Sequence, residues 1–191
     1  MSKAVFLDRD GVINPLVYNI ETGEYESPHY PEDFSVFPAV VKALKELKCQ
    51  GYHLFVVSNQ PSYAKGKTTL ENIQAIEQLL KTYLEENDIP IDRYYYCYHH
   101  PDGVIPEYSG LCGCRKPGTL FLEDAFAGFK LNAEKCWIIG DCDTDAECGK
   151  AMGIHTILIK NKHSANKRGR ETPDDYASDI FEAAKKIIER G

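Results

Sequence analysis

Short, continuous apolar or aromatic runs alternate along this chain with segments of helical periodicity. The runs cover residues 4–7, 54–57, 94–96, 136–139 and 156–159. Between the first two runs, Val40, Leu44 and Leu47 recur at helical spacing before Gly51. Strands that are apolar at consecutive positions are typical of parallel sheets buried on both faces. The alternation therefore predicts an α/β fold, in which a three-layer, Rossmann-like parallel sheet is covered by helices on both faces.

Apolar spacing and capping signals predict the remaining helices. Thr68 and Glu71 form a capping-box pattern ahead of the apolar positions Ile73, Ile76 and Leu80. Further helices are expected over residues 120–129, 145–152 and 178–190. The chain has no internal repeat, and the polar residues 160–172 are predicted to form a loop rather than a domain boundary. The basic stretch 160–170 within it has no interleaved aromatic residues for base stacking, so we interpret it as a solvated loop rather than a nucleic-acid site. We expect one domain over residues 1–191, with loop insertions at residues 14–38 and 97–116 and no cap domain.

The composition excludes several classes of protein. The chain has 191 residues and is 43% hydrophobic, which excludes a disordered protein. Its 22 basic and 29 acidic residues give a net charge of −7, which argues against nucleic acid or a membrane as a partner. No apolar run approaches the roughly 20 residues of a membrane span, and the first residues do not resemble a signal peptide. We therefore expect a cytoplasmic protein with reduced thiols, and a monomer.

Carboxylates stand where two of the predicted strands end. Asp8 and Asp10 follow the first apolar run, and Asp141 follows the run that ends at Ile139. Ligands of open parallel sheets bind outside the carboxyl ends of the strands, so these side chains are expected to meet. Grouped carboxylates repel one another unless a cation joins them, and hard oxygen ligands select Mg²⁺. The sequence therefore predicts a magnesium site at this edge.

Polar and basic residues are expected at the same edge. Ser58 and Asn59 end the second apolar run, and Arg115 and Lys116 precede the helix predicted from residue 120. A hydroxyl and an ammonium group placed there can hold phosphate oxygens. We therefore take these four residues as candidates for binding a phosphorylated substrate.

Four motifs in this order resemble the haloacid dehalogenase superfamily of phosphohydrolases. They are Asp8-Arg9-Asp10-Gly11-Val12, then Ser58, then Lys116, then the run from Gly140-Asp141 to Asp145. The resemblance covers nearly the whole chain. It implies an α/β fold of the haloacid dehalogenase type and a phosphatase mechanism with a catalytic Mg²⁺. It also implies that Asp145 orients a neighbouring group rather than binding the metal.

The resemblance assigns a role to each of these residues. Asp8 is expected to attack phosphorus and form an aspartyl-phosphate. Asp10 is expected to protonate the leaving alcohol and then to deprotonate the attacking water. Mg²⁺, held by Asp8, the Asp10 carbonyl and Asp141, would neutralise charge on the phosphoryl group. Ser58 and Lys116 would hold the phosphoryl oxygens.

Cysteine and histidine residues cluster between the second and fourth motifs. Cys97 and His99 are followed by Cys112 and Cys114, and three thiolates with one imidazole form a closed tetrahedral set typical of structural Zn²⁺. His100 is an alternative to His99 in this set, and an ordinary loop without metal is the alternative to the whole cluster. A zinc-bound loop here would fix Arg115 and Lys116, which follow directly, in the phosphate site.

The pattern C-x-H followed by C-x-C-R-K-P is similar to the zinc-bearing branch of the superfamily. That branch contains heptose-1,7-bisphosphate phosphatases and histidinol-phosphate phosphatases. It implies a small phosphorylated sugar as substrate, with heptose 1,7-bisphosphate cleaved at position 7 as the first expectation, in heptose or lipopolysaccharide biosynthesis. Arg115 would contact the second phosphate, which favours this substrate over the cationic histidinol phosphate. A zinc-stabilised, non-catalytic binding module is the alternative of another class.

Several positions depart from that branch. Pro61 and Tyr63 alter the segment after the second strand, and Cys142 stands where a Lys or Arg is common. Cys142 is therefore a candidate reactive thiol next to Asp141. The cover of the site is expected to consist of loops alone, with the tyrosines of residues 14–38 serving mainly in loop packing.

Overall fold

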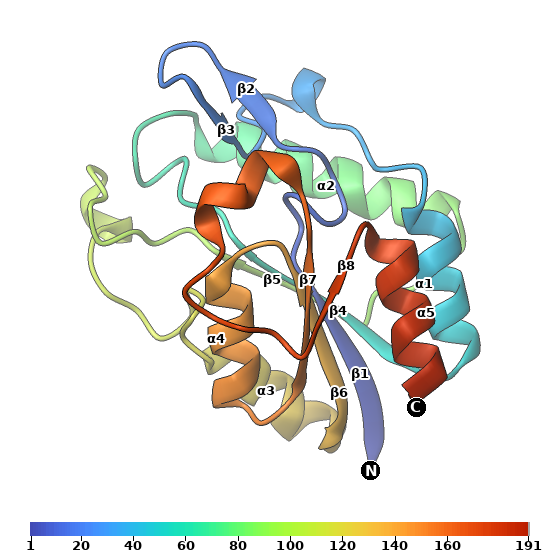
Figure 1. Cartoon of the computed structure of the whole chain (residues 1–191). Helices are drawn as coiled ribbons and strands as arrows, with labels where there is room; N and C mark the ends of the chain where they lie inside the picture. Colours follow the sequence, from blue (N-terminus) through green and yellow to red (C-terminus); the bar gives the residue numbers. More distant parts are fainter. Residues whose placement is uncertain (191) are drawn as a thin grey trace.

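A six-stranded parallel sheet forms the centre of the computed structural model, which describes residues 1–190 (Figure 1). Its strand order is β5-β4-β1-β6-β7-β8. The strands span Ser2–Leu7 (β1), His53–Asn59 (β4), Arg93–Cys97 (β5), Leu131–Gly140 (β6), His155–Ile159 (β7) and Asp175–Ala177 (β8). In β1, Leu7 pairs with Val56 on one side and with Ile139 on the other, so the carboxyl ends of three strands are aligned.

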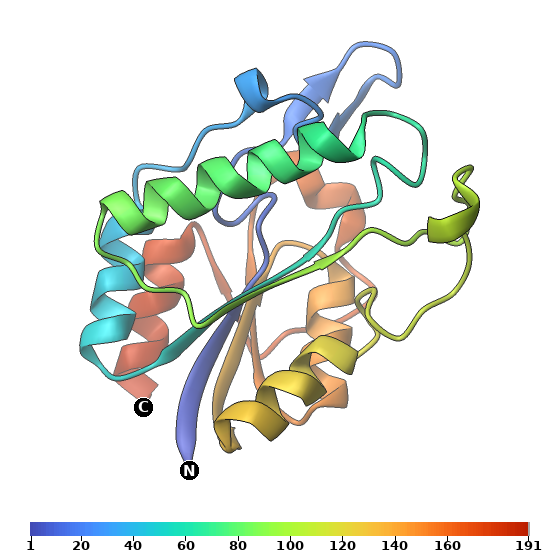
Figure 2. The ribbon, with the colours of Figure 1, turned by 180° about the vertical axis from the view of Figure 1, so that it is seen from behind.

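Helices cover both faces of the sheet, as the alternation of the sequence predicts (Figures 1 and 2). One face is covered by α1 (Val40–Cys49), α2 (Leu70–Glu86) and α5 (Ile180–Arg190). The other face is covered by α3 (Leu120–Phe129) and α4 (Asp143–Ala151). The predicted three-layer α/β fold is confirmed.

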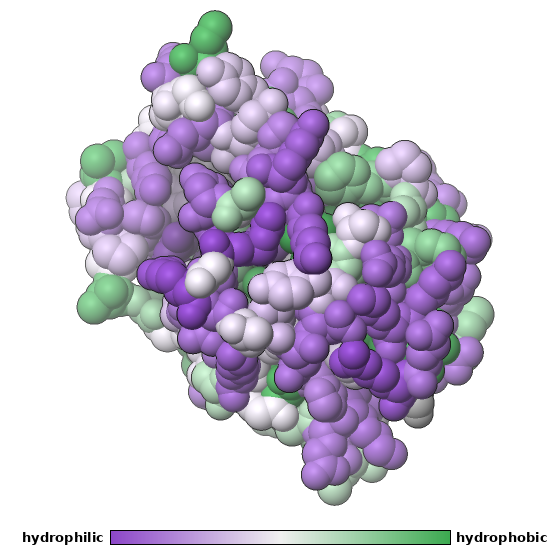
Figure 3. All heavy atoms as spheres, in the orientation of Figure 1, coloured by the Kyte–Doolittle hydropathy of each residue, from purple (hydrophilic) through white to green (hydrophobic). Residues whose placement is uncertain are grey.

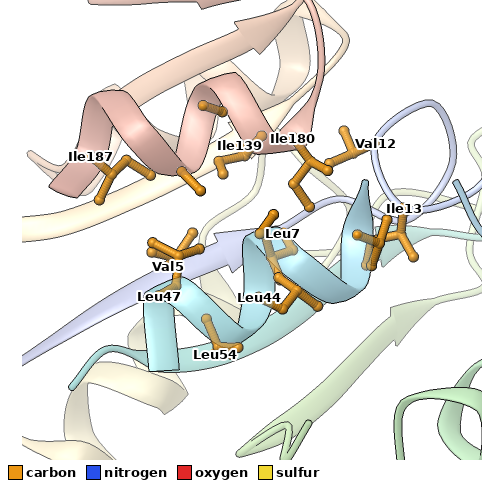
Figure 4. Packing of buried hydrophobic residues seen from close by; sticks show 14 of the residues in the cluster. Val5, Leu7, Val12, Ile13, Leu44, Leu47, Leu54, Ile139, Ile180 and Ile187 are labelled. Atoms are coloured by element: carbon orange, nitrogen blue, oxygen red, sulfur yellow. The ribbon is translucent and has the colours of Figure 1, made fainter. Parts of the chain in front are cut away.

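The central strand shows why the runs are continuously apolar. Val5 and Leu7 of β1 pack among the residues of α1 and α5 (Figure 4). Ala4 and Phe6 pack toward α3 on the other face. All four are fully buried. Because successive side chains of a strand point to opposite faces, a strand between two helical layers needs apolar residues at every position. Each large aliphatic side chain so buried contributes about 1.5–3 kcal/mol.

Loop insertions lie at the carboxyl edge of the sheet. Residues 14–38 contain an antiparallel hairpin of β2 (Val17–Asn19) and β3 (Glu24–Glu26), followed by a 3-10 turn over Pro31–Asp33. A second excursion follows β5 and contains one 3-10 turn, Pro106–Tyr108. Neither insertion has the size of a separate cap domain. None of the helices within residues 1–190 is long and apolar enough to cross a membrane.

Three local predictions differ from the structure. Helix α2 is capped by Thr69, whose Oγ1 accepts a hydrogen bond from the Asn72 amide at 3.2 Å, and not by Thr68. Strand β8 was not predicted, because its three residues at the sheet edge form no apolar run. The predicted loop over residues 160–172 contains a 3-10 helix, Lys162–Lys167, which packs over the carboxyl edge of the sheet (Figure 1).

Candidate active site

Asp8 and Asp10 lie just beyond the end of β1, on a tight turn. The turn closes through hydrogen bonds from the amides of Ile13 and Asn14 to the Arg9 carbonyl. Gly11 has a φ of +85°, and a Cβ on it would lie 2.1 Å from Oδ2 of Asp141. Only glycine therefore permits the close approach of the β1 turn to the end of β6. This approach brings Asp141 to the two predicted catalytic carboxylates.

Three buried polar side chains orient Asp10. The fully buried Arg9 donates from Nε and Nη2 to the Asp10 carboxylate at 3.1–3.2 Å and from Nη2 to Gln60 Oε1 at 2.7 Å. Gln60 donates to Asp10 Oδ2 at 2.6 Å, and Asn14 donates to Asp10 Oδ1 at 2.9 Å. None of these three positioning residues was predicted from the sequence. Their signal was weak, since Arg9 and Gln60 only adjoin the motif residues.

Lys116 enters the same site from the segment before α3. Its Nζ donates to the Val57 carbonyl at 2.7 Å and pairs with Asp8 Oδ1 at 3.0 Å and with Asp145 at 2.6 Å. The flanking carboxylates raise the pKa of this buried ammonium group against the opposing effect of burial, so the charge is retained. Asn59 holds the Lys116 backbone through both ends of its amide, at 3.0 and 3.1 Å.

Asp8 occupies an environment that disfavours its charge. Burial raises its pKa to about 6, with repulsion from Asp145 and Asp10 adding to the effect and Lys116 opposing it. Several carboxylates around one lysine leave the site with an excess of negative charge. A cation near Asp8 would remove this excess and keep the carboxylate ionised, as a nucleophile requires.

Asp141 has the property expected of a metal ligand. It is 2% exposed, and its buried Oδ2 accepts no hydrogen bond from the described residues. Asp145, by contrast, accepts bonds from the amides of Asp141 and Cys142 and pairs with Lys116, so it orients its neighbours. An unpartnered buried carboxylate oxygen beside Asp8 fits a hard divalent cation such as Mg²⁺.

Ser58 and Arg115 are placed differently from one another. Ser58 is buried, its Oγ accepts a hydrogen bond from Gln60 at 2.9 Å, and it does not line the cavity in front of Asp8. Its contact with a phosphoryl group stays a prediction. Arg115 lines that cavity and donates from Nη1 to the His99 carbonyl at 3.3 Å.

The four predicted metal ligands of the loop after β5 meet at one point. The sulfur atoms of Cys97, Cys112 and Cys114 lie 3.2–3.6 Å apart, and His99 Nδ1 lies 3.7 and 3.9 Å from two of them. Four ligands at about 2.3 Å from one ion would be separated by nearly 4 Å, so this Cys/His cluster could hold a tetrahedral metal ion. His100 does not belong to this group of meeting ligand atoms, and its Nδ1 accepts a hydrogen bond from the Asp102 amide at 3.0 Å.

A cavity of about 520 Å³ opens in front of Asp8 and Asp10, a size that suits a small metabolite. On the side of β4 and β5 it is lined by Lys65, Arg115 and Lys116. On the side of β6 and β7 it is lined by Asp141, Cys142, Asn166, Lys167 and Arg170. Residues 160–170 are therefore more than the solvated loop that the sequence predicts, because three of their exposed side chains line the cavity. Asp143, buried at the start of α4, binds their backbone and brings them to the site.

The β2–β3 hairpin covers the cavity and contacts both of its sides. Glu26 accepts a hydrogen bond from Lys67 at 2.5 Å, and Ser27 lies 3.1 Å from Ser62 through the two hydroxyl oxygens. On the opposite side, the ring of Tyr25 stacks on His163, with centroids 3.5 Å apart. The site is thus covered by a loop insertion, and Tyr25 lines the cavity as well as packing the hairpin.

Comparisons with known proteins agree with this geometry. A family model described as HAD-hydrolase-like matches residues 113–183. The D-glycero-D-manno-heptose-1,7-bisphosphate 7-phosphatase of Chlorobaculum tepidum is 32% identical, over 98% of this chain and 94% of that protein. The D-glycero-beta-D-manno-heptose-1,7-bisphosphate 7-phosphatase of Haemophilus influenzae is 31% identical, over 100% and 98% of the two chains.

A solved structure shows the same fold. The D,D-heptose 1,7-bisphosphate phosphatase of B. bronchiseptica, crystallised with magnesium and phosphate, superposes with a TM-score of 0.78 at 20% identity and covers 99% of both chains. The two relatives named above exceed 30% identity along almost the whole chain. They show that the protein belongs to the haloacid dehalogenase-like hydrolases, in the family of the heptose-bisphosphate phosphatases, and that it is a phosphoric monoester hydrolase.

Proposed function

We propose that this enzyme removes the 7-phosphate of D-glycero-D-manno-heptose 1,7-bisphosphate through an aspartyl-phosphate on Asp8. The observation that carries the proposal is the placement of Asp8 against Lys116, with a second carboxylate, Asp10, fixed beside it. A nucleophile held by a cation and a separately oriented acid are the two groups that a double-displacement phosphatase needs.

The chain's residues supply the proton transfers. A carboxylate oxygen of Asp8 forms a bond to phosphorus while the bond from phosphorus to the sugar oxygen breaks, and Asp10 gives its proton to that oxygen. Asp10 then takes a proton from water, whose oxygen attacks phosphorus and releases Asp8. Arg9 and Gln60 hold the Asp10 carboxylate in one orientation through both steps. Lys116 and Ser58 are assigned to the phosphoryl oxygens.

We assign the divalent cation to Asp8, the carbonyl of Asp10 and Asp141. The unpartnered Oδ2 of Asp141 and the excess of carboxylates support Mg²⁺ in this place. The ion would neutralise charge on the phosphoryl group in the transition state.

We assign Zn²⁺ to Cys97, His99, Cys112 and Cys114. A set of three thiolates and one imidazole is closed and leaves no position for substrate, so this ion would be structural. Cys114 directly precedes Arg115 and Lys116. Zinc would therefore hold the segment that delivers these two cations to the cavity.

The cations of the cavity favour a bisphosphate substrate over histidinol phosphate. Lys65, Lys67 and Arg115 all line the cavity, and burial, with repulsion from Lys67 and Arg115, lowers the pKa of Lys65. A second phosphate would relieve this repulsion, whereas a cationic amino alcohol would add to it. We also propose that the enzyme is a monomer of the cytoplasm, where its seven unpaired cysteines would stay reduced.

A turnover screen tests the proposal. Phosphate release is measured with heptose 1,7-bisphosphate, histidinol phosphate and a phosphorylated oligonucleotide, in the presence of Mg²⁺. We expect the highest kcat/KM with the heptose bisphosphate, and no release by Asp8→Asn, which keeps the size of the side chain and removes the nucleophile. Faster turnover of histidinol phosphate would contradict the substrate, and activity of Asp8→Asn would contradict the nucleophile.

A further inference from the structure

Basic residues approach the reaction centre from a segment that the mechanism does not use. The segment, residues 162–170, follows β7, and β7 borders β6 in the sheet. Two of its basic side chains, Lys167 and Arg170, line the cavity. Arg115 lines it from the side of β4 and β5, and β1, which carries Asp8, lies between β4 and β6. The centre thus has cationic groups on both sides.

A buried carboxylate holds this segment in place. Asp143 is 2% exposed, and it accepts hydrogen bonds from the amides of Gly169, Arg170 and Glu171 at 3.0, 3.0 and 3.3 Å. Hydrogen bonds to a charged acceptor are stronger than neutral ones. Asp143 therefore fixes the end of the segment to the first turn of α4, two residues after Asp141.

Arg168 fixes the same segment to the strand that carries the metal ligand. Its Nη1 donates to the Asp141 carbonyl at 2.8 Å and its Nη2 donates to the Asn161 carbonyl at 2.6 Å. Ser164 also donates to the Asp141 carbonyl, at 3.3 Å. Arg168 is occupied by these bonds, whereas Lys167 forms no ion pair or side-chain hydrogen bond with any residue in the range 1–190. An anchored segment therefore presents an uncommitted ammonium group to the cavity.

We propose that Lys167, with Arg170 beside it, forms a specificity-determining subsite for an anionic group of the substrate other than the phosphate that is transferred. This inference rests on the proposed function and deepens it. The carboxylates Asp8, Asp10 and Asp141 repel a second phosphate, so a bisphosphate needs cations beyond the reaction centre. Lys167 and Arg115 would hold that phosphate from opposite sides of the cavity.

The hydrophilic character of this region fits the inference. Figure 3 shows mainly hydrophilic residues over the segment, and a hydrophobic group at the tip of the hairpin. That tip carries the exposed Ile20. A cavity with mainly hydrophilic residues around its opening suits a charged, polar metabolite rather than an apolar one.

Kinetics with matched substrates test the subsite. We expect Lys167→Ala to raise KM for heptose 1,7-bisphosphate roughly tenfold, the value of one charge-assisted hydrogen bond, and to raise KM for heptose 7-phosphate far less. Lys167→Arg should restore most of the loss. Lys162→Ala is the control, because Lys162 is an exposed lysine of the same segment that does not line the cavity. Equal effects of Lys167→Ala on both substrates, or an equal effect of Lys162→Ala, would overturn the proposal.

Binding without turnover separates this proposal from the proposed function. In an Asp8→Asn background, calorimetry should show that Lys167→Ala weakens binding of the bisphosphate by a similar factor. If Asp8→Asn does not bind the bisphosphate at all, the substrate assignment fails and the subsite fails with it. If Asp8→Asn binds it and Lys167→Ala leaves the affinity unchanged, only the subsite fails.

Discussion

The two sides of the active-site cavity are held in place by different means. On the side of β4 and β5, which we call the Lys116 side, the amide of Asn59 holds the Lys116 backbone, and the Cys/His cluster, which could hold a metal ion, directly precedes Arg115 and Lys116. On the side of β6 and β7, which we call the Lys167 side, a carboxylate and a guanidinium group bind backbone atoms of residues 162–170. Both arrangements present cations to one substrate.

We expect the Lys116 side to govern the chemical step and the Lys167 side to govern substrate affinity. Lys116 Nζ lies 3.0 Å from Oδ1 of Asp8, the proposed nucleophile, so a displacement on the Lys116 side is expected to reach the reacting atoms. Lys167 and Arg170 are exposed side chains at the rim. Displacement on the Lys167 side is therefore expected to change affinity more than the rate of the chemical step.

The largest effect is expected from breaking the Cys/His cluster. Cys112→Ser replaces a thiolate with a weak ligand, and we expect loss of bound zinc and a fall in kcat/KM of roughly 100-fold, at the upper end of effects on metal sites. The reason is that the segment carrying Lys116 begins directly after the cluster. Elemental analysis and phosphate release measure the two quantities.

A cysteine outside the cluster provides the control for this variant. Cys49 is exposed at the end of α1, and Cys49→Ser should leave zinc content and turnover unchanged. Zinc stoichiometry that survives Cys112→Ser would contradict the cluster as a metal site. Lost zinc with full activity would show that hydrogen bonds alone hold Lys116.

A smaller loss of turnover is expected from Asn59→Ala. This change removes two hydrogen bonds to the Lys116 backbone, worth about 2 kcal/mol together, so kcat should fall by roughly 10- to 30-fold. Zinc content should be retained, which distinguishes this variant from Cys112→Ser. An unchanged kcat at saturating substrate would mean that the cluster and the bond to Val57 position Lys116 without Asn59.

On the Lys167 side, Asp143→Ala should act on affinity and on local order. It removes three hydrogen bonds, but the freed amides are near solvent, so the cost in stability is about 1 kcal/mol. Limited trypsin digestion followed by mass spectrometry should show faster cleavage within residues 162–170. The cleavage rate of Asp143→Asn, which keeps one acceptor oxygen, should lie between the rates of Asp143→Ala and the wild type. Digestion at the wild-type rate would contradict the anchoring role.

The fold was largely predictable because its signals are local. Consecutive apolar residues such as those around Phe6 and Ile138 are needed wherever a strand lies between two helical layers, so such strands can be recognised as apolar runs in the sequence. Strand β8 was not predictable in this way. It pairs with β7 at the edge of the sheet, so its pairing depends on the completed fold rather than on its own three residues.

The site was predictable only in part, for a related reason. Residues that follow a strand directly, such as Asp8 and Asp141, are placed by the strand itself. Arg9 and Gln60 are recognisable as positioning groups only once their burial is known, since a sequence gives no sign that Arg9 is fully buried. The role of Lys167 depends on contacts between Asp143 and a segment 26–28 residues away, and no spacing rule predicts them.

The smallest effect is expected at Cys142, which the sequence presented as a candidate reactive thiol. Its Sγ donates to Asp141 Oδ1 at 3.0 Å, and burial, with Asp141 and Asp145, raises its pKa. The raised pKa keeps the thiol protonated at pH 8, so iodoacetamide should alkylate the exposed Cys49 of the native protein and spare Cys142 until urea is added. Mass spectrometry of the peptides measures both.

Cys142 lies on the Lys167 side of the cavity and bears on where the cations of that side come from. A neutral thiol next to Asp141 supplies no charge to the substrate, so the cations of the Lys167 side must come from residues 162–170. Cys142→Ser should therefore change KM for the bisphosphate by less than Lys167→Ala does, because a serine hydroxyl can donate the same bond to Asp141. A larger rise in KM for Cys142→Ser than for Lys167→Ala would show that Cys142 rather than residues 162–170 controls affinity on this side, and rapid alkylation of native Cys142 would contradict its raised pKa.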